Sequence, residues 1–398
     1  MESLTNGPLT KAECEAVLQM RHAMHREPEL SNNEWKTQKR IRETLESFGV
    51  TGAKTFHKTG LYVDIQGSAP GPNRSIAVRG DIDALPIQEQ RDDLPYRSQV
   101  HGVMHACGHD MHGSIALGTA LAFHRMREQF SGKVRVVFHP AEEAEPVGGR
   151  SVVEEKLLEG FDAAIGFHVN EKIPAGAYGA RAGAVTNSSD EFAVKFIGTM
   201  AHGAEPHSGV DAIAISGAFI NEVQKVVSRE IPNIDRPIVT IGTIHGGEAT
   251  NIICPAVSMR GTIRTSSSER REMLVRRVRE VAEGVAAVHR GRAEFTSHSG
   301  EPPVINDAAM VEAFRLLVFQ SIGDDKFFER PPSSGSDDFG FYSSCVPSIY
   351  FWFGSREAGN DSPAHTPTFG ASDSILIPTT ELAIQYCWNL LHSWSRSP

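Results

Sequence analysis

Three short apolar segments alternate with two segments of helical character in the first half of this chain. Residues 75–79, 133–138 and 163–167 are largely apolar and have the length of strands. Residues 114–126 are small and apolar enough for a buried helix, and a second helix is expected at 149–158. This order favours an α/β fold in which helices flank a mixed, mostly parallel sheet.

The patterning changes further along the chain, which at 398 residues is too long for one ordinary domain. From residue 190 to 196, apolar and polar residues alternate as in a half-exposed strand. We therefore predict a smaller α+β domain inserted at 188–296, and a discontinuous first domain formed by 1–187 and 297–398. Three further elements are expected to complete the first domain: helices at 308–322 and 379–394, and a strand at 348–353.

The composition argues against several classes of function. The formal net charge of -10 includes no acidic block, and no basic cluster suits a nucleic-acid footprint. The five cysteines are odd in number and scattered, which favours free thiols in a reducing compartment over a disulfide framework. We find no secretion-type signal and no apolar run of the ~18 residues that a spanning helix needs. A cytoplasmic protein without nucleic-acid or membrane partners is expected.

Metal-ligating side chains are dense in the segment HACGHDMH at 105–112 and recur where the predicted strands end. Asp81 and Asp83 follow the first strand, Glu142 and Glu143 the second, and His168 the third. Ligands of open α/β sheets bind beyond the carboxyl ends of the strands, and imidazole, carboxylate and thiolate hold divalent metals in hydrolases. Five residues could supply two ions: Cys107, His109, Glu143, His168 and His365, the last on a loop stiffened by Pro363 and Pro367.

The motifs around these residues resemble those of one family. The sequence is similar to the amidohydrolase branch of the aminoacylase and carboxypeptidase superfamily of metallopeptidases, which includes hippurate hydrolases and auxin-conjugate hydrolases. The resemblance spans nearly the whole chain. Its motifs are HREPEL at 25–30 with Glu34 and Thr37, RGDIDALP at 79–86, HACGHDMHG at 105–113, FHPAEE at 138–143, GFH at 166–168, AHGAEPH at 201–207, GSDDF at 335–339 and PAH at 363–365.

The resemblance implies a binuclear metal site with five protein ligands, namely Cys107, His109, Glu143, His168 and His365. The thiolate would lie close to both ions, for which zinc or manganese is expected, with cobalt or nickel as alternatives. Glu142 would be the general base for a metal-activated water. Glu142 and Glu143 can face different groups only on an irregular loop, which Pro140 and Pro146 predict. Asp81 and Asp83 are expected to orient the ligands by hydrogen bonds.

The inserted domain resembles the family's lid and dimerisation domain, so a homodimer or higher homo-oligomer is expected. His202 matches the histidine that contacts the oxyanion, often across the subunit interface. Asn251 and Arg264 match a pair that holds the substrate carboxylate, which suits the planar fork of arginine. A glycine pair usually precedes the histidine in the family. Here Met200 and Ala201 stand in its place, which leaves the substrate preference open.

The sequence therefore predicts a metal-dependent amidohydrolase that cleaves N-acyl amino acids, such as hippurate-like or N-acetyl substrates, to a carboxylic acid and a free amino acid. A dipeptidase or carboxypeptidase on the same scaffold is an alternative, as is a metal-binding pseudoenzyme. Four further histidines have no place in the ligand set and are expected to pack or to hydrogen-bond near it: His105, His112, His139 and His207.

Overall fold

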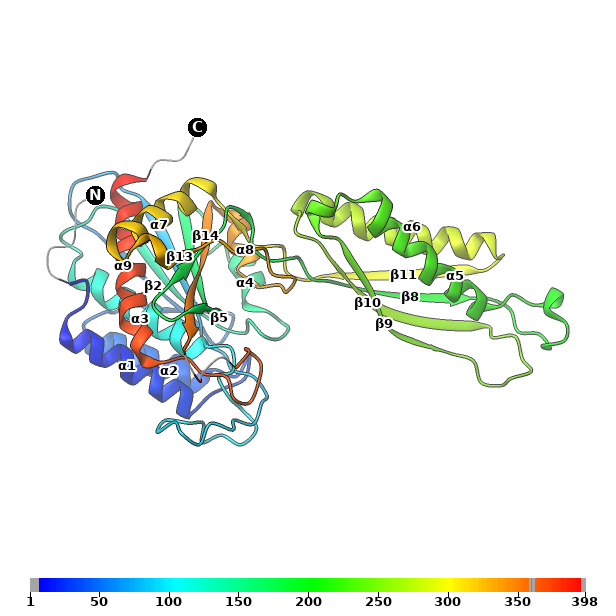
Figure 1. The fold of residues 1–398 in the computed structure, drawn as a ribbon, viewed down its shortest axis with the longest axis horizontal. Helices are drawn as coiled ribbons and strands as arrows, with labels where there is room; N and C mark the ends of the chain where they lie inside the picture. Colours follow the sequence, from blue (N-terminus) through cyan, green and yellow to red (C-terminus); the bar gives the residue numbers. More distant parts are fainter. Residues whose placement is uncertain (1–6, 358, 360–361, 395–398) are drawn as a thin grey trace. The chain divides into compact units, whose positions relative to one another are not determined.

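The computed structural model describes residues 7–357, 359 and 362–394, and the chain divides into two compact units. The first unit comprises the described residues up to Gly183, Ile305–Pro331 and those from Phe341 onward. The second unit comprises Ala184–Val304 and Pro332–Gly340, so the predicted insertion at 188–296 lies within it. Each unit has its own sheet with helices packed against it (Figure 1).

The first unit is built on an eight-stranded sheet in the order β1-β2-β4-β3-β5-β14-β6-β13. The four central strands, β4, β3, β5 and β14, run parallel, whereas β1 and β2 are antiparallel at one side. The mixed, mostly parallel sheet that the sequence predicts is thereby confirmed. The strands are β1 (Lys54–Phe56), β2 (Gly60–Gln66), β3 (Ser75–Asp81), β4 (Lys133–His139), β5 (Ala163–Pro174), β6 (Tyr178–Gly179), β13 (Phe327–Phe328) and β14 (Ser348–Arg356).

The helices of the first unit cover this sheet, and one of them is central. They are α1 (Lys11–Arg26), α2 (Trp35–Ser47), α3 (His109–Arg125), α4 (Gly148–Glu154), α7 (Ala308–Ser321), α8 (Gly340–Cys345) and α9 (Leu376–Ser393). Every residue of α3 from His109 to Phe123 is buried, between β3, α1 and α9. Small residues permit this, because a Cβ on Gly80 of β3 would lie 2.3 Å from the His112 carbonyl oxygen. The start of α3 is thus held against the end of β3.

The second unit has a four-stranded antiparallel sheet in the order β11-β8-β10-β9, and two helices cover the same face of it (Figure 1). The alternation predicted at 190–196 is that of β8, whose Phe192, Val194 and Phe196 enter the core under these helices. The elements are β8 (Asp190–Ile197), α5 (Ala212–Lys225), β9 (Ile238–Gly246), β10 (Ala256–Arg264), α6 (Ser268–Val288) and β11 (Arg292–Ser299). Two short strands, β7 (Gly183–Ala184) and β12 (Ile305–Asn306), pair separately. None of the described helices is long and apolar enough to cross a membrane.

A buried polar network joins α1 to the first turn of α3. The Asp110 carboxylate lies 3.0 Å from His25 Nδ1 and 3.3 Å from Arg21 Nε, and His25 Nε2 lies 3.1 Å from Glu89 Oε1. Burial alone would lower the pKa of His25, but the bonds to Asp110 and Glu89 outweigh it and raise the pKa to about 9. His25 is therefore a protonated imidazole at neutral pH, in contact with two carboxylates.

The raised pKa of His25 predicts that the protein loses stability in alkali. A group whose pKa is higher in the folded state contributes its full stability below its unfolded pKa, about 6.5, and loses it as the pH rises through about 9. The free energy of unfolding should fall over this range, by up to about 3 kcal/mol. Urea unfolding with chelator at pH 6.5 and 9.5 measures this. A His25→Gln variant should show a smaller fall, and equal falls would contradict the prediction.

Candidate metal centre

The polar residues that follow the predicted strands meet at one edge of the first unit's sheet. Asp81 ends β3 and is in register with His139, which ends β4. The neighbouring strand β5 carries His168 on the other side of β3. Because these strands are parallel, their carboxyl ends lie together, and the loop after β4 brings Glu142 and Glu143 to the same edge.

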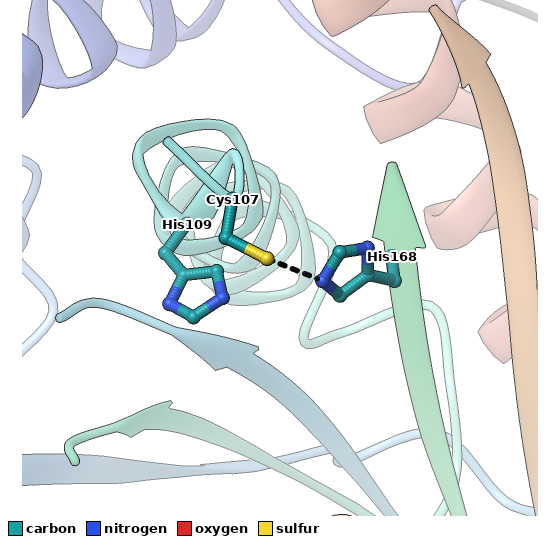
Figure 2. A group of neighbouring side chains, drawn as sticks. All are labelled: Cys107, His109 and His168. Carbon is teal, nitrogen blue, oxygen red and sulfur yellow. Dashed lines mark hydrogen bonds between the residues drawn. The ribbon is translucent and has the colours of Figure 1, made fainter. Parts of the chain in front are cut away.

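The structure brings all five predicted ligands together. Cys107 Sγ lies 3.3 Å from Nε2 of His168 and 3.3 Å from Nε2 of His365. His365 Nε2 is in turn 3.3 Å from Glu143 Oε1, and His109 Nε2 is 3.8 Å from the same oxygen. Figure 2 shows Cys107 and His109 at the start of α3, with the His168 ring of β5 directed at the sulfur.

These residues form two candidate ligand sets that share one thiol. The first set is Cys107, His109 and His168, and the second is Cys107, Glu143 and His365, with the ligand atoms of each set within 4.8 Å of one another. Two groups of three donors around a common sulfur suit a pair of divalent ions.

Two observations show that the donor atoms fit cations. His109 Nε2 is buried and has no hydrogen-bond partner among the described residues, an arrangement that is costly unless a cation contacts it. Burial raises the pKa of Cys107 well above its usual value, and the charges of Glu143 and Glu142 raise it further. The thiolate form therefore depends on a compensating positive charge.

Hydrogen bonds on the far side of two imidazoles fix their orientation. His109 Nδ1 lies 3.1 Å from Asp83 Oδ1, and His168 Nδ1 lies 2.6 Å from the Val169 carbonyl oxygen. With Nδ1 as the donor in each ring, both Nε2 atoms present lone pairs to the site. His365 is held by its backbone, whose N–H donates to the Ala106 carbonyl oxygen over 2.8 Å.

Asp83 connects both ligand sets, because it also accepts hydrogen bonds from the Glu143 N–H (3.0 Å) and the Ser31 hydroxyl (2.7 Å). Burial alone would raise the pKa of Asp83, but its hydrogen bonds with His109, Glu143 and Ser31 and the His109 charge together lower the pKa to about 2. We expect Asp83→Asn to weaken metal affinity by about 10- to 100-fold. The side-chain amide of asparagine would turn its own N–H toward one of the N–H or O–H groups that now donate to Asp83, so that hydrogen bond would be lost. Competition with a chelating dye measures the affinity. Ser31→Ala removes only the hydroxyl bond and should have a smaller effect; equal affinities for wild type and Asp83→Asn would contradict the assignment.

Asp81 acts on the site through His112. The Arg79 guanidinium lies 2.6 Å from Asp81 Oδ2, and His112 Nδ1 lies 2.6 Å from Asp81 Oδ1. His112 Nε2 then accepts the N–H of Val169, next to His168, over 2.9 Å. Burial would raise the pKa of Asp81, but the Arg79 charge, together with the charges of His109 and His112 and the His112 hydrogen bond, holds the pKa well below its usual range. Both nitrogens of His112 are thus engaged in hydrogen bonds that link β3, α3 and β5.

The other first-unit histidines that the sequence leaves outside the ligand set lie in the core. His139 Nδ1 is 2.8 Å from the Tyr342 hydroxyl oxygen. Burial lowers the pKa of His105 to about 4, so its imidazole is neutral. Both side chains are buried in the first unit.

Glu142 lies on the segment between His139 and Gly148, which contains neither helix nor strand. A carboxylate oxygen of Glu142 lies within 4.8 Å of the ligand atoms of His109 and Glu143. Glu142 and Glu143 are both half-buried. The arrangement places a second carboxylate beside the candidate metal ligands, where it can accept a proton from a water molecule.

The remaining predicted site residues belong to the second unit. His202 is exposed, and its loop pairs with the loop of Asn251, whose carbonyl oxygen accepts the Gly203 N–H over 2.7 Å. Arg264 is half-buried at the last position of β10, whereas Asn251 precedes the first residue of that strand. The length of β10, about 25 Å, separates Arg264 from the loops of His202 and Asn251. Within one chain, Asn251 and Arg264 therefore do not meet around one carboxylate.

An α/β sheet with two thiol-sharing ligand sets at its carboxyl edge, and a separate α+β unit inserted in the chain, defines a metal-dependent hydrolase. Residues 77–387 match the model of peptidase family M20/M25/M40. The chain belongs to this family.

Several relatives match nearly the full length of the chain. It is 66% identical to the uncharacterized hydrolase y4tI of Sinorhizobium fredii, over 98% of each chain. It is 35% identical to an N-acetyl-L-cysteine deacetylase of Bacillus subtilis, over 95% of this chain and 88% of the relative. Among solved structures, the Bacillus subtilis YXEP protein, a dinuclear metal-binding peptidase, superposes with a TM-score of 0.82 at 32% identity, over 96% of this chain and 99% of the other.

Proposed function

We propose that this protein is a binuclear metal-dependent amidohydrolase that cleaves the amide bond of N-acyl amino acids to a carboxylic acid and a free amino acid. The observation that carries the proposal is the pair of ligand sets sharing Cys107, with the Glu142 carboxylate beside them. The similarity to an N-acetyl-L-cysteine deacetylase supports an N-acyl amino acid as the substrate class.

Two divalent ions, zinc or manganese, would be held by Cys107, His109, Glu143, His168 and His365. When bound, they would supply Lewis-acid polarisation of the substrate carbonyl and a lower pKa for the attacking water. Glu142 takes the proton of that water and returns it to the leaving nitrogen, so one water is consumed as the amide becomes an acid and an amine. Asp83 and the pair of Asp81 and His112 keep the ligands in position.

His202 is proposed to donate a hydrogen bond to the oxyanion, and Asn251 and Arg264 to bind the substrate carboxylate. Because β10 separates Arg264 from the other two within one chain, we propose a homodimer or higher homo-oligomer. One copy would then supply Arg264, and a second copy would supply His202 and Asn251.

Mixing two inactive variants tests whether His202 acts across the subunit interface. Glu142→Gln and His202→Ala are expected to be nearly inactive alone, each losing about 10²-fold or more in kcat. When they are unfolded, mixed and refolded together, mixed dimers contain one site with both an intact Glu142 and a partner's intact His202, so turnover should return. If light scattering shows that the refolded mixture is dimeric, no recovery of turnover would contradict the shared site.

A substrate panel tests the proposed reaction. Purified protein is loaded in turn with zinc, manganese, cobalt and nickel, and amine release is followed from N-acetyl and N-benzoyl amino acids, free-amino dipeptides and longer peptides. Turnover of N-acyl amino acids supports the proposal. Turnover of free-amino dipeptides alone would identify a dipeptidase. Hydrolysis of longer peptides from the carboxyl end would identify a carboxypeptidase, and metal binding with no turnover would identify a pseudoenzyme.

A further inference from the structure

The segment that carries Glu142 has an unusual backbone just before that residue. Ala141 has a φ of +52°, a left-handed conformation that residues other than glycine rarely adopt. Its side chain is completely buried, and its carbonyl oxygen accepts the Gly148 N–H over 3.1 Å. A conformation of this kind persists only where its surroundings hold it.

The partner of the Ala141 N–H is a buried carboxylate from a distant part of the chain. Glu34 Oε1 accepts this N–H over 2.8 Å, and the Glu34 side chain is completely buried. Glu34 directly precedes α2, a position where side chains usually cap the helix. Here the Glu29 carboxylate caps it instead, by accepting the N–H groups of Lys36 (3.2 Å) and Thr37 (2.8 Å). The Glu34 carboxylate is therefore directed at the Ala141 segment.

A second buried carboxylate holds the other side of Glu142. Asp83 accepts the N–H of Glu143 over 3.0 Å. The N–H groups of the residues on either side of Glu142, Ala141 and Glu143, thus each donate to a buried carboxylate. The carboxylates of Asp83 and Glu34 differ in one respect. Asp83 also contacts the candidate ligand His109, whereas no hydrogen bond joins Glu34 to any of the five candidate ligands in the described part of the chain.

We propose that Glu34 is a positioning residue for the general base, holding the Glu142 carboxylate at the metal centre through the Ala141 N–H. This inference rests on the proposed function, in which Glu142 transfers the proton. A small displacement of a catalytic group lowers turnover strongly, because the reacting atoms must be aligned to within a fraction of an ångström.

The surroundings of Glu34 indicate which substitution should be tolerated. Burial and, next, the negative charge of Asp83 together raise its pKa to about 7, against the lowering effect of hydrogen bonds with Thr59 and the Ala141 N–H. Glu34 is therefore partly protonated at neutral pH, and a neutral side chain with a carbonyl oxygen in the same place should accept the Ala141 N–H as well. Glutamine meets this requirement. Methionine has a similar length but offers no comparable acceptor.

The experiment compares Glu34→Met and Glu34→Gln. In Glu34→Met we expect kcat for an N-acyl amino acid to fall by about 10- to 100-fold. KM and the metal content, measured by plasma mass spectrometry, should be unchanged. Glu34→Gln should restore kcat to near the wild-type value. Hydrogen exchange of the segment 140–146, followed by mass spectrometry, should be faster in Glu34→Met alone.

A matched control separates positioning from stability. Glu29→Met removes the cap of the same helix, so it should lower the melting temperature without changing kcat or exchange in the segment 140–146. If Glu34→Met does not fold, Glu34→Ser removes the same acceptor and the same readouts apply.

The two hypotheses fail in different ways. Absence of turnover by the metal-loaded wild type would overturn the proposed function. Unchanged exchange in segment 140–146, or a kcat as low in Glu34→Gln as in Glu34→Met, would overturn the role of Glu34. Loss of bound metal from Glu34→Met would also overturn it, because the effect would then act through the ligands.

Discussion

Glu142→Gln is expected to lower kcat for N-acyl amino acid hydrolysis by about 10²- to 10⁴-fold, the usual contribution of a general base. Glutamine has nearly the same shape as glutamate but cannot take a proton from water. Because Glu142 lies beside the ligand sets and is not needed for their five donors, KM and bound metal should stay near their wild-type values. Steady-state kinetics and metal analysis of the same samples measure both.

The same loop offers a control for Glu142→Gln. Glu145 is exposed on the segment between β4 and α4, so Glu145→Gln makes the same chemical change away from the centre and should leave kcat unchanged. Full activity of Glu142→Gln would show that another group transfers the proton. Loss of metal from Glu142→Gln would show instead that Glu142 is a ligand.

Cys107→Ala should remove both ions and with them the activity. Cys107 is the only residue common to the two three-ligand sets, so each set falls to two protein donors when the thiol is lost. The loss of affinity should exceed the about 10- to 100-fold expected for a residue that only orients a ligand. His365→Ala depletes one set and leaves Cys107, His109 and His168 in place, so that variant should retain one ion per chain.

Metal stoichiometry after dialysis against a weak chelator distinguishes these variants. Two ions per chain are expected in the wild type, one in His365→Ala and none in Cys107→Ala. Cys345 is exposed, and Cys345→Ala is the matched control that should keep both ions. If Cys107→Ala retained two ions, the thiol would not be the shared ligand.

The sequence predicts those parts of the site whose positions follow from short-range patterns along the chain. Apolar segments indicate where β3 and β4 end, and parallel pairing with β5 brings His168 to the same edge, so the convergence of Asp83, Glu143 and His168 could be anticipated. The strand predicted at 163–167 nevertheless continues to Pro174, so His168 lies within β5 and does not follow it. The predicted ends of helices are less accurate. The helix predicted at 149–158 ends at Glu154. The segment beyond it is a run of turns, which helix-like apolar spacing does not reveal.

The features that the sequence does not predict depend on contacts between distant residues. Glu34 and Ala141 are 107 positions apart, and neither the positive φ of Ala141 nor its bond to Glu34 has a local sequence signal. The separation of Asn251 and Arg264 follows from the path of β10, which residue types alone do not show. The motif around residue 34 marked the region as part of the family pattern, and only the structure connects it to Glu142.

Because of where their residues lie along the chain, the two ligand sets are completed at different times during synthesis. Cys107, His109 and His168 all precede the second unit, whereas His365 follows β14, which is made after that unit. All three residues of the first set are therefore translated long before the last residue of the second set. If both sets hold an ion, as proposed, the second set would be complete only after the segment beyond β14 has been translated.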